Sequence, residues 1–475
     1  MISPILYKDF YKTDHRRQYP DKTSLVYSNL TPRTSRLEGV DKVVVFGIQY
    51  FIKDYLMRRF NEGFFKKPKA EAIANYKRRM DTSLGPDAFP LNHLEELHDL
   101  GYLPIEIKAL PEGSTCPLRV PFLTIYNTRP EFFWLTNFLE TIMCNVIWGA
   151  VNSATIAHEY KKILTQYAKD TSDVPEFVQW QGHDFSMRGM FGFEAALISG
   201  MAHLLSFTGT DTIPAIDALE HFYNANAEKE LIGASVPATE HSVMCMGSQE
   251  EEKETYRRLL TKVYPKGIVS IVSDTWDYWN VFDVILPALK DVILNRDGKL
   301  VVRPDSGDPV EVICGTDTEK GSIERLWDIF GGKVNSKGFK ELDSHIGLIY
   351  GDSITIERCK AICEGLKKKG FATTNVVYGI GSYTYQYNTR DTLGFAMKST
   401  YGEIDGVGYN IFKQPKTDNG IKNSAKGLLR VNEDYSLSQE VSWKEEGEGL
   451  LETVFRDGDI IKEYSLAEIR ARLNK

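Results

Sequence analysis

Residues 346–382 read IGLIYGDSITIERCKAICEGLKKKGFATTNVVYGIGS, and this stretch predicts a strand, a helix and a second strand. The runs 346–352 and 374–382 are rich in β-branched residues and have the length of buried strands. Between them, apolar residues recur at three- and four-residue steps over 355–369, and Gly370 follows as a helix stop. Two strands joined by a helix indicate a parallel pair, because parallel neighbours need a crossover of this length.

The same rhythm occurs upstream of this stretch. Residues 267–274 (GIVSIVSD) and 299–305 (KLVVRPD) are two further strand-like runs, and helical periodicity follows them at 276–295 and 321–330. Repeated strand–helix units predict an α/β fold with a parallel sheet, either open or closed into a barrel.

Other segments are less regular. We expect the following elements outside the repeated units: a short strand over 42–51, helical segments over 71–81 and 92–100, long and largely buried helices within 131–168, and exposed loops over 332–344 and 414–426.

Bulk composition describes an ordinary globular protein. The chain has 475 residues, 42% of them hydrophobic, and a net charge of −8, which argues against non-specific nucleic-acid binding. No run approaches the roughly 18 apolar residues of a membrane span, and the N-terminus does not resemble a signal peptide. The six cysteines lack Cys-x-x-Cys spacing and zinc-site patterns. We therefore expect a soluble cytoplasmic protein that binds neither nucleic acid nor membrane.

Polar residues stand where the four strand-like runs end. They are Asp274 and Asp277 after the first run, Arg303 and Asp305 after the second, Asp352 after the third, and the turn 379–382 after the fourth. In parallel α/β folds the carboxyl ends of the strands line the active face. One such aspartate is commonly a helix cap, but four successive strand ends with polar chemistry predict an active site.

These residues suit a sugar phosphate. Asp305 and Asp352 can accept hydrogen bonds from vicinal hydroxyls or hold a hydrated Mg²⁺. Arg303 offers a planar donor fork, and Gly379 and Gly381 allow backbone N–H groups to approach an anion. No phosphate-binding P-loop or complete Gly-x-Gly-x-x-Gly fingerprint occurs, which disfavours a P-loop ATPase and a Rossmann dinucleotide site.

One histidine stands in an irregular stretch. Residues 231–244 read LIGASVPATEHSVM, and His241 follows Glu240 in a context that is neither a clean helix nor a clean strand. Taken alone, His241 is more often a capping or surface residue than a catalytic one.

A set of distinctive motifs runs along the chain. In chain order they are YKDFYKTDHRRQYP, WLTNFLETI, HDFSMRG, GTDT, SVPATEHS, VSDTWDYWN, RPDSGDP, GD after a strand, TRD, and the C-terminal VFRDGDIIKEYSLAEIR. Together they resemble the nicotinamide phosphoribosyltransferase family. The similarity runs from about residue 4 to near the C-terminus, which is nearly the whole chain.

The resemblance implies an enzyme of NAD salvage. Members transfer phosphoribose from phosphoribosyl pyrophosphate (PRPP) to nicotinamide, giving nicotinamide mononucleotide and pyrophosphate with Mg²⁺. They act as head-to-tail homodimers with active sites at the subunit interface. ATP hydrolysis through a phosphohistidine is coupled to the transfer, and by resemblance His241 is that histidine, with Glu240 beside it to orient the ring.

The resemblance also assigns the base site. Phe185 corresponds to the aromatic that stacks on one face of the pyridine ring, and Tyr11 of the partner subunit covers the other face. Asp211 accepts the amide N–H and Arg303 donates to the amide oxygen, so the pair selects nicotinamide over nicotinate. Asp9 of the partner subunit lies near the base.

The remaining assignments concern ribose, phosphate and metal. By resemblance the ribose and 5′-phosphate residues are Arg188, Asp305, Gly351, Asp352, Gly381, Ser382 and Arg390, and the pyrophosphate and ATP residues are Arg33, Lys398 and Lys413. The implied Mg²⁺ is held mainly by substrate phosphates, near Asp277 and Asp305.

Three departures from the family pattern stand out. The phosphate turn 379–383 is Gly-Ile-Gly-Ser-Tyr where the family has Gly-Ser-Gly-Gly-Gly, Trp180 replaces a tyrosine, and Tyr387 replaces a lysine. Three alternatives stay open: a nicotinate phosphoribosyltransferase, a non-catalytic nucleotide-binding relative, and a metal-dependent barrel hydrolase.

The resemblance implies two domains. We expect an irregular (β/α) barrel over 148–389, and a second α/β domain that combines 1–147 with 390–475.

Overall fold

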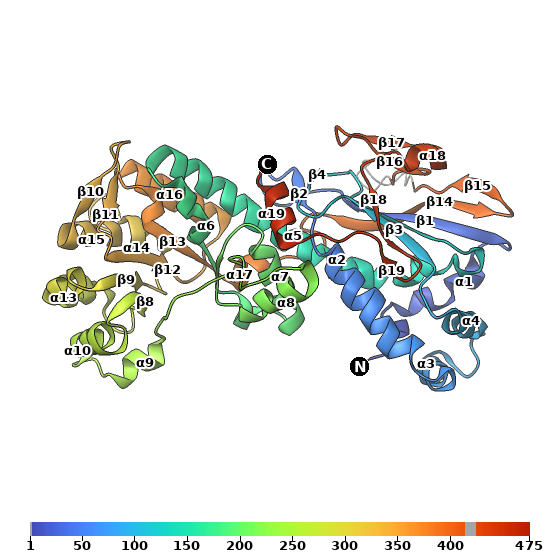
Figure 1. Cartoon of the computed structure of the whole chain (residues 1–475), viewed down its shortest axis with the longest axis horizontal. Coiled ribbons are helices and arrows are strands. Elements are labelled where there is room, and N and C mark those ends of the chain that lie inside the picture. The colour runs from blue at the N-terminus through green and yellow to red at the C-terminus, as the bar shows by residue number, and fades with distance from the viewer. Residues whose placement is uncertain (1, 414–423) are drawn as a thin grey trace. The chain divides into compact units, whose positions relative to one another are not determined.

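The computed structural model describes residues 2–413 and 424–475, and it divides the chain into two compact units (Figure 1). The first unit comprises 1–155, 218–225 and 388–475, and the second comprises 156–217 and 226–387. Residues 148–155, 218–225 and 388–389, which the sequence places in the barrel domain, belong to the first unit. Part of the predicted loop 414–426 lies outside the described residues.

The first unit is built on an antiparallel sheet with the strand order β15-β14-β1-β5-β3-β18-β19. Its strands are β1 (Thr23–Pro32), β3 (Ile105–Ala109), β5 (Leu123–Asn127), β14 (Phe395–Ile404), β15 (Val407–Asn410), β18 (Glu452–Arg456) and β19 (Asp459–Ile460). Two-stranded sheets pair β2 (Lys42–Val44) with β4 (Thr115–Pro117), and β16 (Leu429–Val431) with β17 (Leu437–Gln439).

Both ends of the chain contribute to this sheet. β1 from the N-terminal segment pairs with β14 from the C-terminal segment, with Asn29 opposite Lys398. The helices of this unit are α1 (His15–Gln18), α2 (Ile48–Tyr50), α3 (Lys69–Leu84), α4 (Asn92–Leu100), α18 (Trp443–Glu446), α19 (Leu466–Leu473) and the first part of α5 (Leu135–Thr171).

The predicted strand over 42–51 is wrong in its second half. Only β2 (Lys42–Val44) is extended, and α2 begins at Ile48 after Gly47, whose φ of 90° turns the backbone. The buried Glu112 accepts hydrogen bonds from the backbone N–H groups of Gly47 (3.1 Å) and Gln49 (2.6 Å). A carboxylate that is distant in the sequence therefore accepts hydrogen bonds from N–H groups at the start of this helix, which the apolar run does not predict.

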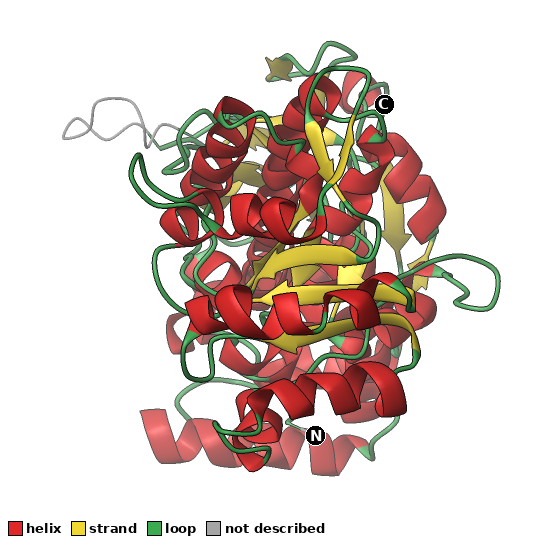
Figure 2. Cartoon of the chain, turned by 90° about the vertical axis from the view of Figure 1, so that its left-hand side faces the viewer, coloured by secondary structure: helices red, strands yellow, loops and turns green. Residues whose placement is uncertain are grey.

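The second unit contains a parallel sheet with the order β7-β6-β13-β12-β9-β8. Its strands are β6 (Gly182–Asp184), β7 (Gly209–Thr210), β8 (Lys266–Val272), β9 (Asp297–Arg303), β12 (Ile346–Tyr350) and β13 (Val376–Ile380). Four of these six are the strands that the sequence predicts, and the helices of the unit lie outside the curled sheet (Figure 2).

The helices of the second unit follow the repeated pattern. They are α6 (Val178–Gln181), α7 (Phe193–His203), α8 (Ile213–Tyr223, shared with the first unit), α9 (His241–Met246), α10 (Glu252–Arg258), α11 (Tyr278–Asn280), α12 (Leu286–Ala288), α13 (Lys290–Leu294), α14 (Pro309–Cys314), α15 (Ser322–Phe330), α16 (Ile356–Lys368) and α17 (Ser382–Gln386). The predicted helix over 276–295 consists of several short pieces, and Pro287 stands near the start of α12.

The irregular segment 234–239 joins the two edges of the curled sheet. Ala234 pairs with Gly209 beside β7, and Ala238 pairs with Ser270 of β8, both in parallel orientation. The Thr239 hydroxyl also accepts a hydrogen bond from the backbone N–H of Val272 at 2.9 Å. The backbone groups of both edge strands are thereby partly satisfied, and the sheet closes into an irregular barrel.

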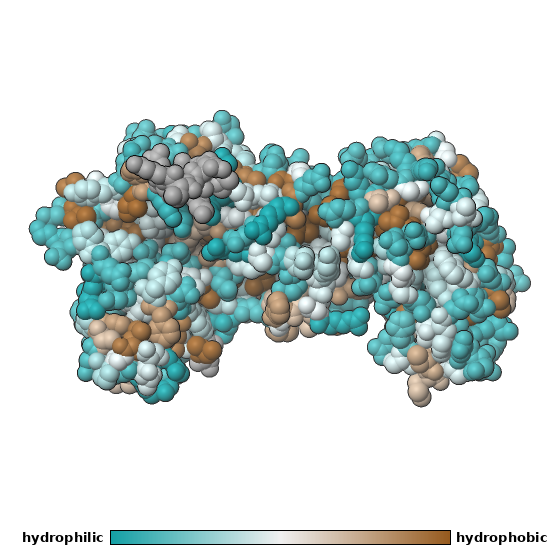
Figure 3. Space-filling view, turned by 180° about the vertical axis from the view of Figure 1, so that it is seen from behind, coloured by the Kyte–Doolittle hydropathy of each residue, from teal (hydrophilic) through white to brown (hydrophobic). Residues whose placement is uncertain are grey.

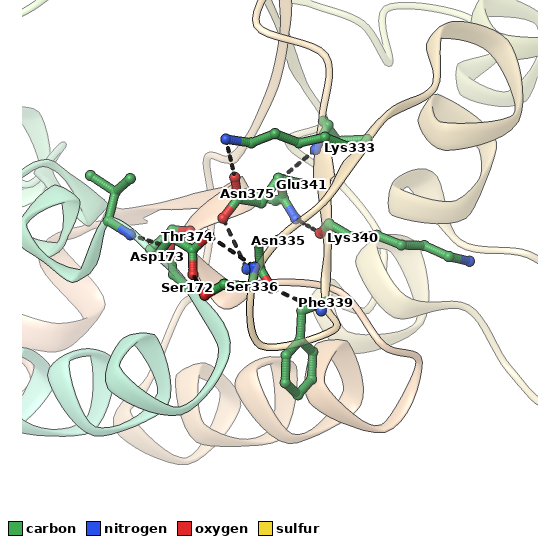
Figure 4. Close-up of polar contacts among 12 residues, drawn as sticks. Ser172, Asp173, Lys333, Asn335, Ser336, Phe339, Lys340, Glu341, Thr374 and Asn375 are labelled. Carbon is green, nitrogen blue, oxygen red and sulfur yellow. Dashed lines mark hydrogen bonds and ion pairs between the residues drawn. The ribbon is translucent and has the colours of Figure 1, made fainter.

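The predicted loop over 332–344 contains a β-hairpin made of β10 (Gly332–Val334) and β11 (Lys340–Leu342). Side-chain amides anchor it (Figure 4). Asn335 donates to the backbone oxygen of Thr171 at 2.8 Å, and Asn375 accepts from the backbone N–H of Leu342 at 2.9 Å. Tertiary hydrogen bonds therefore order a segment whose polar composition is typical of a loop.

Across the described residues, no helix combines the length and the apolar content that crossing a membrane requires. The six cysteines are all unpaired.

Candidate active site

The carboxyl ends of the barrel strands surround a cavity of about 500 Å³ in the second unit. Ten of the residues that the sequence selects line it: Phe185, Arg188, Asp211, Glu240, Arg303, Asp305, Gly351, Asp352, Gly381 and Ser382. They come from six separate strand ends or loops, so the barrel brings together the polar positions that the strand pattern predicts to be close.

Phe185 supplies the aromatic wall of the cavity. It follows β6 directly, and its backbone N–H donates to the oxygen of Ile380 at 2.9 Å. Gly379 gives the ring its space, because a Cβ at that position would lie 2.5 Å from the ring. The glycine is therefore required by a side chain rather than by a turn.

Asp211 and Arg303 provide opposite charges beside this ring. Asp211 follows β7, and its Oδ1 atom accepts hydrogen bonds from two side chains. Burial opposes ionisation of this carboxyl, but hydrogen bonds from His183 and Ser235 keep the pKa of Asp211 below its ordinary value. Arg303 ends β9 and donates to the backbone oxygen of Thr239 at 2.5 Å.

Arg303 has further hydrogen-bonding capacity. Its Nε atom is buried and finds no hydrogen-bond partner among the described residues. Burial lowers the pKa of the guanidinium, while Asp305 and Asp211 oppose that effect. An unsatisfied buried donor is costly, so a ligand oxygen at this place would restore a missing hydrogen bond.

Asp305 occupies a tightly packed position opposite Gly351. Its backbone N–H donates to Asp274 Oδ2 at 2.9 Å, and a Cβ at Gly351 would lie 2.4 Å from Asp305 Oδ1. Asp352 is exposed to the cavity, and its Oδ2 accepts a hydrogen bond from Ser353 at 2.9 Å. Two carboxylates with free acceptor positions thus face the same space.

His241 begins α9 next to these acids. Its Nε2 atom lies 3.8 Å from Asp305 Oδ2 and 3.9 Å from Asp274 Oδ1, and its Nδ1 atom lies 3.2 Å from the Thr275 hydroxyl. Asp274 Oδ1 is buried without a hydrogen-bond partner among the described residues. Glu240 instead accepts a hydrogen bond from the hydroxyl of Ser242, so the groups nearest the His241 ring are Thr275, Asp274 and Asp305.

Asp277 has a local structural task. Its carboxylate accepts hydrogen bonds from the backbone N–H groups of Trp279 (3.0 Å) and Asn280 (3.2 Å), which makes it the N-cap of α11. It is not among the residues that line the cavity.

The first unit holds the other predicted residues. Asp9 accepts a hydrogen bond from Thr141 at 2.8 Å, and Tyr11 is 63% exposed with its ring edge-on to His15. An exposed tyrosine on a folded segment has an apolar face available for a partner.

Basic side chains gather on the first unit. Burial lowers the pKa of Lys398 on β14; Glu140 opposes that effect, and the nearby Arg33 and Lys413 add to it. Arg390 and Lys398 both act on the nearby Cys144 thiol. Neighbouring positive charges of this kind raise the local concentration of anions.

The metal implied by the resemblance is a Mg²⁺ ion that is held mainly by the substrate phosphates. In the ranges 2–413 and 424–475, no cluster of three or more His, Cys, Asp or Glu side chains forms a protein-only metal cage. Asp305 and Asp352 are hard oxygen donors that fit a hydrated Mg²⁺ carried by substrate phosphates.

Three residues near the site are absent from the predicted set: His183, Ser235 and Thr275. The strand-end pattern, which selects Asp274, could also have found Thr275, three residues after the end of β8. His183 lies within the HDFSMRG motif, but its contact with Asp211 joins positions 28 residues apart. No sequence pattern distinguishes Ser235, which lies in an irregular segment.

A second cavity of about 420 Å³ adjoins the first inside the barrel. The two share Phe185, Asp211, Ala238 and Arg303, and the walls of the inner cavity are otherwise largely apolar. Trp180, one of the departures noted above, lies in the wall of the inner cavity, and Tyr383 lies in the wall of the outer one.

Two family descriptions match the chain. Residues 180–458 match the nicotinate phosphoribosyltransferase (NAPRTase) family, and residues 3–107 match the nicotinamide phosphoribosyltransferase N-terminal domain.

Similar sequences cover nearly the whole chain. The nicotinamide phosphoribosyltransferase of Acinetobacter baylyi is 53% identical over 99% of this chain and 97% of its own length. That of Mycoplasma pneumoniae is 36% identical over 88% of this chain and 93% of its own length, and that of Xanthomonas campestris pv. campestris is 32% identical over 98% and 97%.

Solved structures share the fold at low sequence identity. The nicotinate-nucleotide pyrophosphorylase of Pyrococcus furiosus aligns with a TM-score of 0.61 at 14% identity, over 99% of this chain and 95% of its own. Human nicotinic acid phosphoribosyltransferase aligns with a TM-score of 0.53 at 16% identity, over 98% and 93%.

Proposed function

This chain belongs to the nicotinamide phosphoribosyltransferase family, and we propose that it transfers phosphoribose from PRPP to nicotinamide in NAD salvage, coupled to ATP hydrolysis at His241. The observation that carries the proposal is the convergence of Phe185, Asp211, Arg303 and Asp305 on one cavity. An aromatic face, an acceptor, a donor and a ribose-binding acid are the groups that this reaction needs.

Phe185, Asp211 and Arg303 recognise the base. The pyridine ring stacks on Phe185, its amide N–H donates to Asp211, and its amide oxygen accepts from Arg303. This places the ring nitrogen towards the ribose. The Asp211 carboxylate disfavours nicotinate, because two carboxylates would face each other without a proton between them.

The transfer breaks one bond and forms another. The pyridine nitrogen attacks C1′ of PRPP while the bond from C1′ to the pyrophosphate oxygen breaks, and pyrophosphate leaves with that electron pair. Asp305 accepts hydrogen bonds from the ribose hydroxyls and stabilises the positive charge that develops on the sugar. The Gly381–Ser382 turn, at the start of α17, holds the 5′-phosphate through backbone N–H groups.

His241 is the group that couples ATP. A neutral imidazole nitrogen attacks the γ-phosphorus, ADP leaves, and water later releases phosphate from the phosphohistidine. The 3.2 Å contact between Nδ1 and Thr275 and the 3.9 Å approach of Asp274 to Nε2 support an oriented ring. Mg²⁺ carried by the phosphates supplies charge neutralisation near Asp305 and Asp352.

We further propose that a second copy completes each site. In this proposal Tyr11 of the partner subunit covers the open face of the base, Asp9 of the partner subunit lies near its amide, and the basic group around Lys398 meets pyrophosphate or ATP. The face of the molecule seen in Figure 3 is largely hydrophilic and carries separate apolar patches. Exposed apolar residues near the cavity support a covering partner: Phe191 (87%), Phe193 (62%), Ile213 (76%), Tyr383 (54%) and Tyr387 (77%).

The cysteines bear on the cellular compartment. Six unpaired cysteines suit a reducing compartment, so we propose that the enzyme acts in the cytoplasm.

The first test measures nicotinamide mononucleotide formed from nicotinamide, PRPP and Mg²⁺, with and without ATP, for wild type and His241→Ala. ATP should stimulate wild type and leave the variant unchanged. Activity without any response of wild type to ATP would keep the transferase and remove the coupling. Nicotinate as the preferred base would instead favour the rival nicotinate phosphoribosyltransferase, whose family description matches residues 180–458.

The dimer has its own test. Tyr11→Ala and Asp305→Asn each disable a different half of the shared site, so hybrid dimers should keep one intact site. Co-expression should restore about a quarter of wild-type activity, because half of randomly assembled dimers are hybrids. No recovery in isolated hybrids would show that each chain completes its own site.

A further inference from the structure

We propose that His183 and Ser235 are positioning residues that hold the Asp211 carboxylate in one orientation and thereby set the choice of base. The inference rests on the proposed function, since it concerns how the base-binding acid is held. Neither residue needs to touch the substrate for this effect.

Both residues bind the same oxygen of Asp211. His183 Nε2 lies 2.9 Å from Asp211 Oδ1, and the Ser235 hydroxyl donates to that oxygen at 2.6 Å. An ionised carboxylate only accepts hydrogen bonds, so His183 must carry its proton on Nε2. Because Ser235 Oγ also lies 3.4 Å from that nitrogen, the three side chains form one compact cluster.

The second carboxylate oxygen is left for the ligand. No described residue hydrogen-bonds to Asp211 Oδ2, and Asp211 lines both cavities. The backbone of Asp211 is fixed as well, because its N–H donates to the oxygen of Asp184 at 2.9 Å. With Oδ1 occupied and the main chain held, the free oxygen presents a single acceptor direction to the cavity.

The holding groups are themselves fixed by the barrel. His183 lies on β6, and its ring packs against Gly209, where a Cβ would come within 2.7 Å of Nδ1. Ser235 follows Ala234, which pairs with Gly209 as part of the segment that closes the barrel. The closure of the barrel therefore sets the direction of the acid.

This arrangement distinguishes the two bases physically. Two donors on one oxygen stabilise the charged form of Asp211 and prevent its rotation. A charged, fixed acceptor gains a hydrogen bond from a primary amide and meets unrelieved repulsion from a carboxylate. A mobile acid could turn away from nicotinate, so freeing it should weaken discrimination along with amide binding.

The test uses Ser235→Ala, His183→Leu and His183→Gln. Loss of one hydrogen bond to a charged group should raise the KM for nicotinamide about tenfold in the first two variants. The KM for PRPP and kcat should stay within about twofold of wild type, and the nicotinamide-to-nicotinate ratio of kcat/KM should fall about tenfold. Glutamine keeps an N–H donor of similar reach, so His183→Gln should recover most of the preference.

Two controls separate the possible failures. Ser270→Ala removes a hydroxyl from the wall of the same inner cavity, where that hydroxyl has no hydrogen-bond partner among the described residues, and should behave as wild type. Asp211→Asn tests the acid itself. If Asp211→Asn leaves base preference unchanged, the proposed base recognition fails. If it alters the preference but Ser235→Ala and His183→Leu do not, only the positioning inference is overturned.

Discussion

Gly351→Ala should damage PRPP binding while leaving the fold intact. A Cβ at this position would lie 2.4 Å from Asp305 Oδ1, whereas ordinary contacts begin at 3.4 Å, so the carboxylate has to move by about 1 Å. Gly351 does not adopt a positive φ, and the substitution therefore adds no backbone strain. The clash falls on the acid that we assign to the ribose.

The magnitude follows from that displacement. A misplacement of about 1 Å in a reacting group can cost about 100-fold in rate. We expect kcat/KM for PRPP to fall between about 10-fold and 100-fold, which is about 1.4 to 2.7 kcal/mol of transition-state stabilisation. The assay is initial-rate formation of nicotinamide mononucleotide at varied PRPP, with the melting temperature measured in parallel.

A matched control lies on the preceding strand. At Gly347, a Cβ would come no closer than 3.3 Å to the flexible side chain of Lys299, so Gly347→Ala should retain wild-type kinetics. An unchanged kcat/KM for PRPP in Gly351→Ala would refute the reasoning, because Asp305 would then tolerate displacement without loss. A large drop in melting temperature would assign the effect to folding instead.

Three further outcomes are expected. Gly379→Ala should push the Phe185 ring from its place, where a Cβ would lie 2.5 Å away, and should raise the KM for nicotinamide about tenfold with a lower melting temperature. Asp274→Asn removes the negative charge 3.9 Å from His241, and should reduce phosphoenzyme formed from γ-labelled ATP more than it reduces ATP-independent transfer. Burial lowers the pKa of Lys8 to about 7, so above that pH the folded chain binds fewer protons than the unfolded chain. The free energy of unfolding, and with it the melting temperature, should therefore rise between about pH 7 and 10. Replacing Lys8 by methionine should flatten that dependence, and an unchanged slope would assign it to other groups.

The repeated strands of the barrel are visible in the sequence because their signal is local. β8, β9, β12 and β13 begin within two residues of the predicted runs 267–274, 299–305, 346–352 and 374–382. A run of β-branched residues indicates a parallel strand that is buried on both faces. Such a strand needs apolar neighbours, but it does not need particular partner residues. The polar residues that follow the second, third and fourth runs line the cavity, because the carboxyl ends of parallel strands lie at one edge of the sheet.

Segments ordered by long-range contacts are not visible in this way. The hairpin over 332–342 depends on hydrogen bonds from Asn335 and Asn375, and the helix after Gly47 depends on the distant Glu112. Their composition is typical of a loop in one case and of a strand in the other. Residues that are distant in the sequence override both of these local preferences, because they form hydrogen bonds with backbone groups that would otherwise lack a partner.

The sequence by itself therefore determines the α/β class, the strand ends that supply Arg303 and Asp305, and, through its motifs, the family to which the chain belongs. The tertiary structure alone decides that residues 234–239 close the barrel, and that His183 and Ser235 meet on one oxygen of Asp211. Periodicity encodes which face of an element is buried, whereas closure and side-chain clusters depend on distances between segments that share no local pattern.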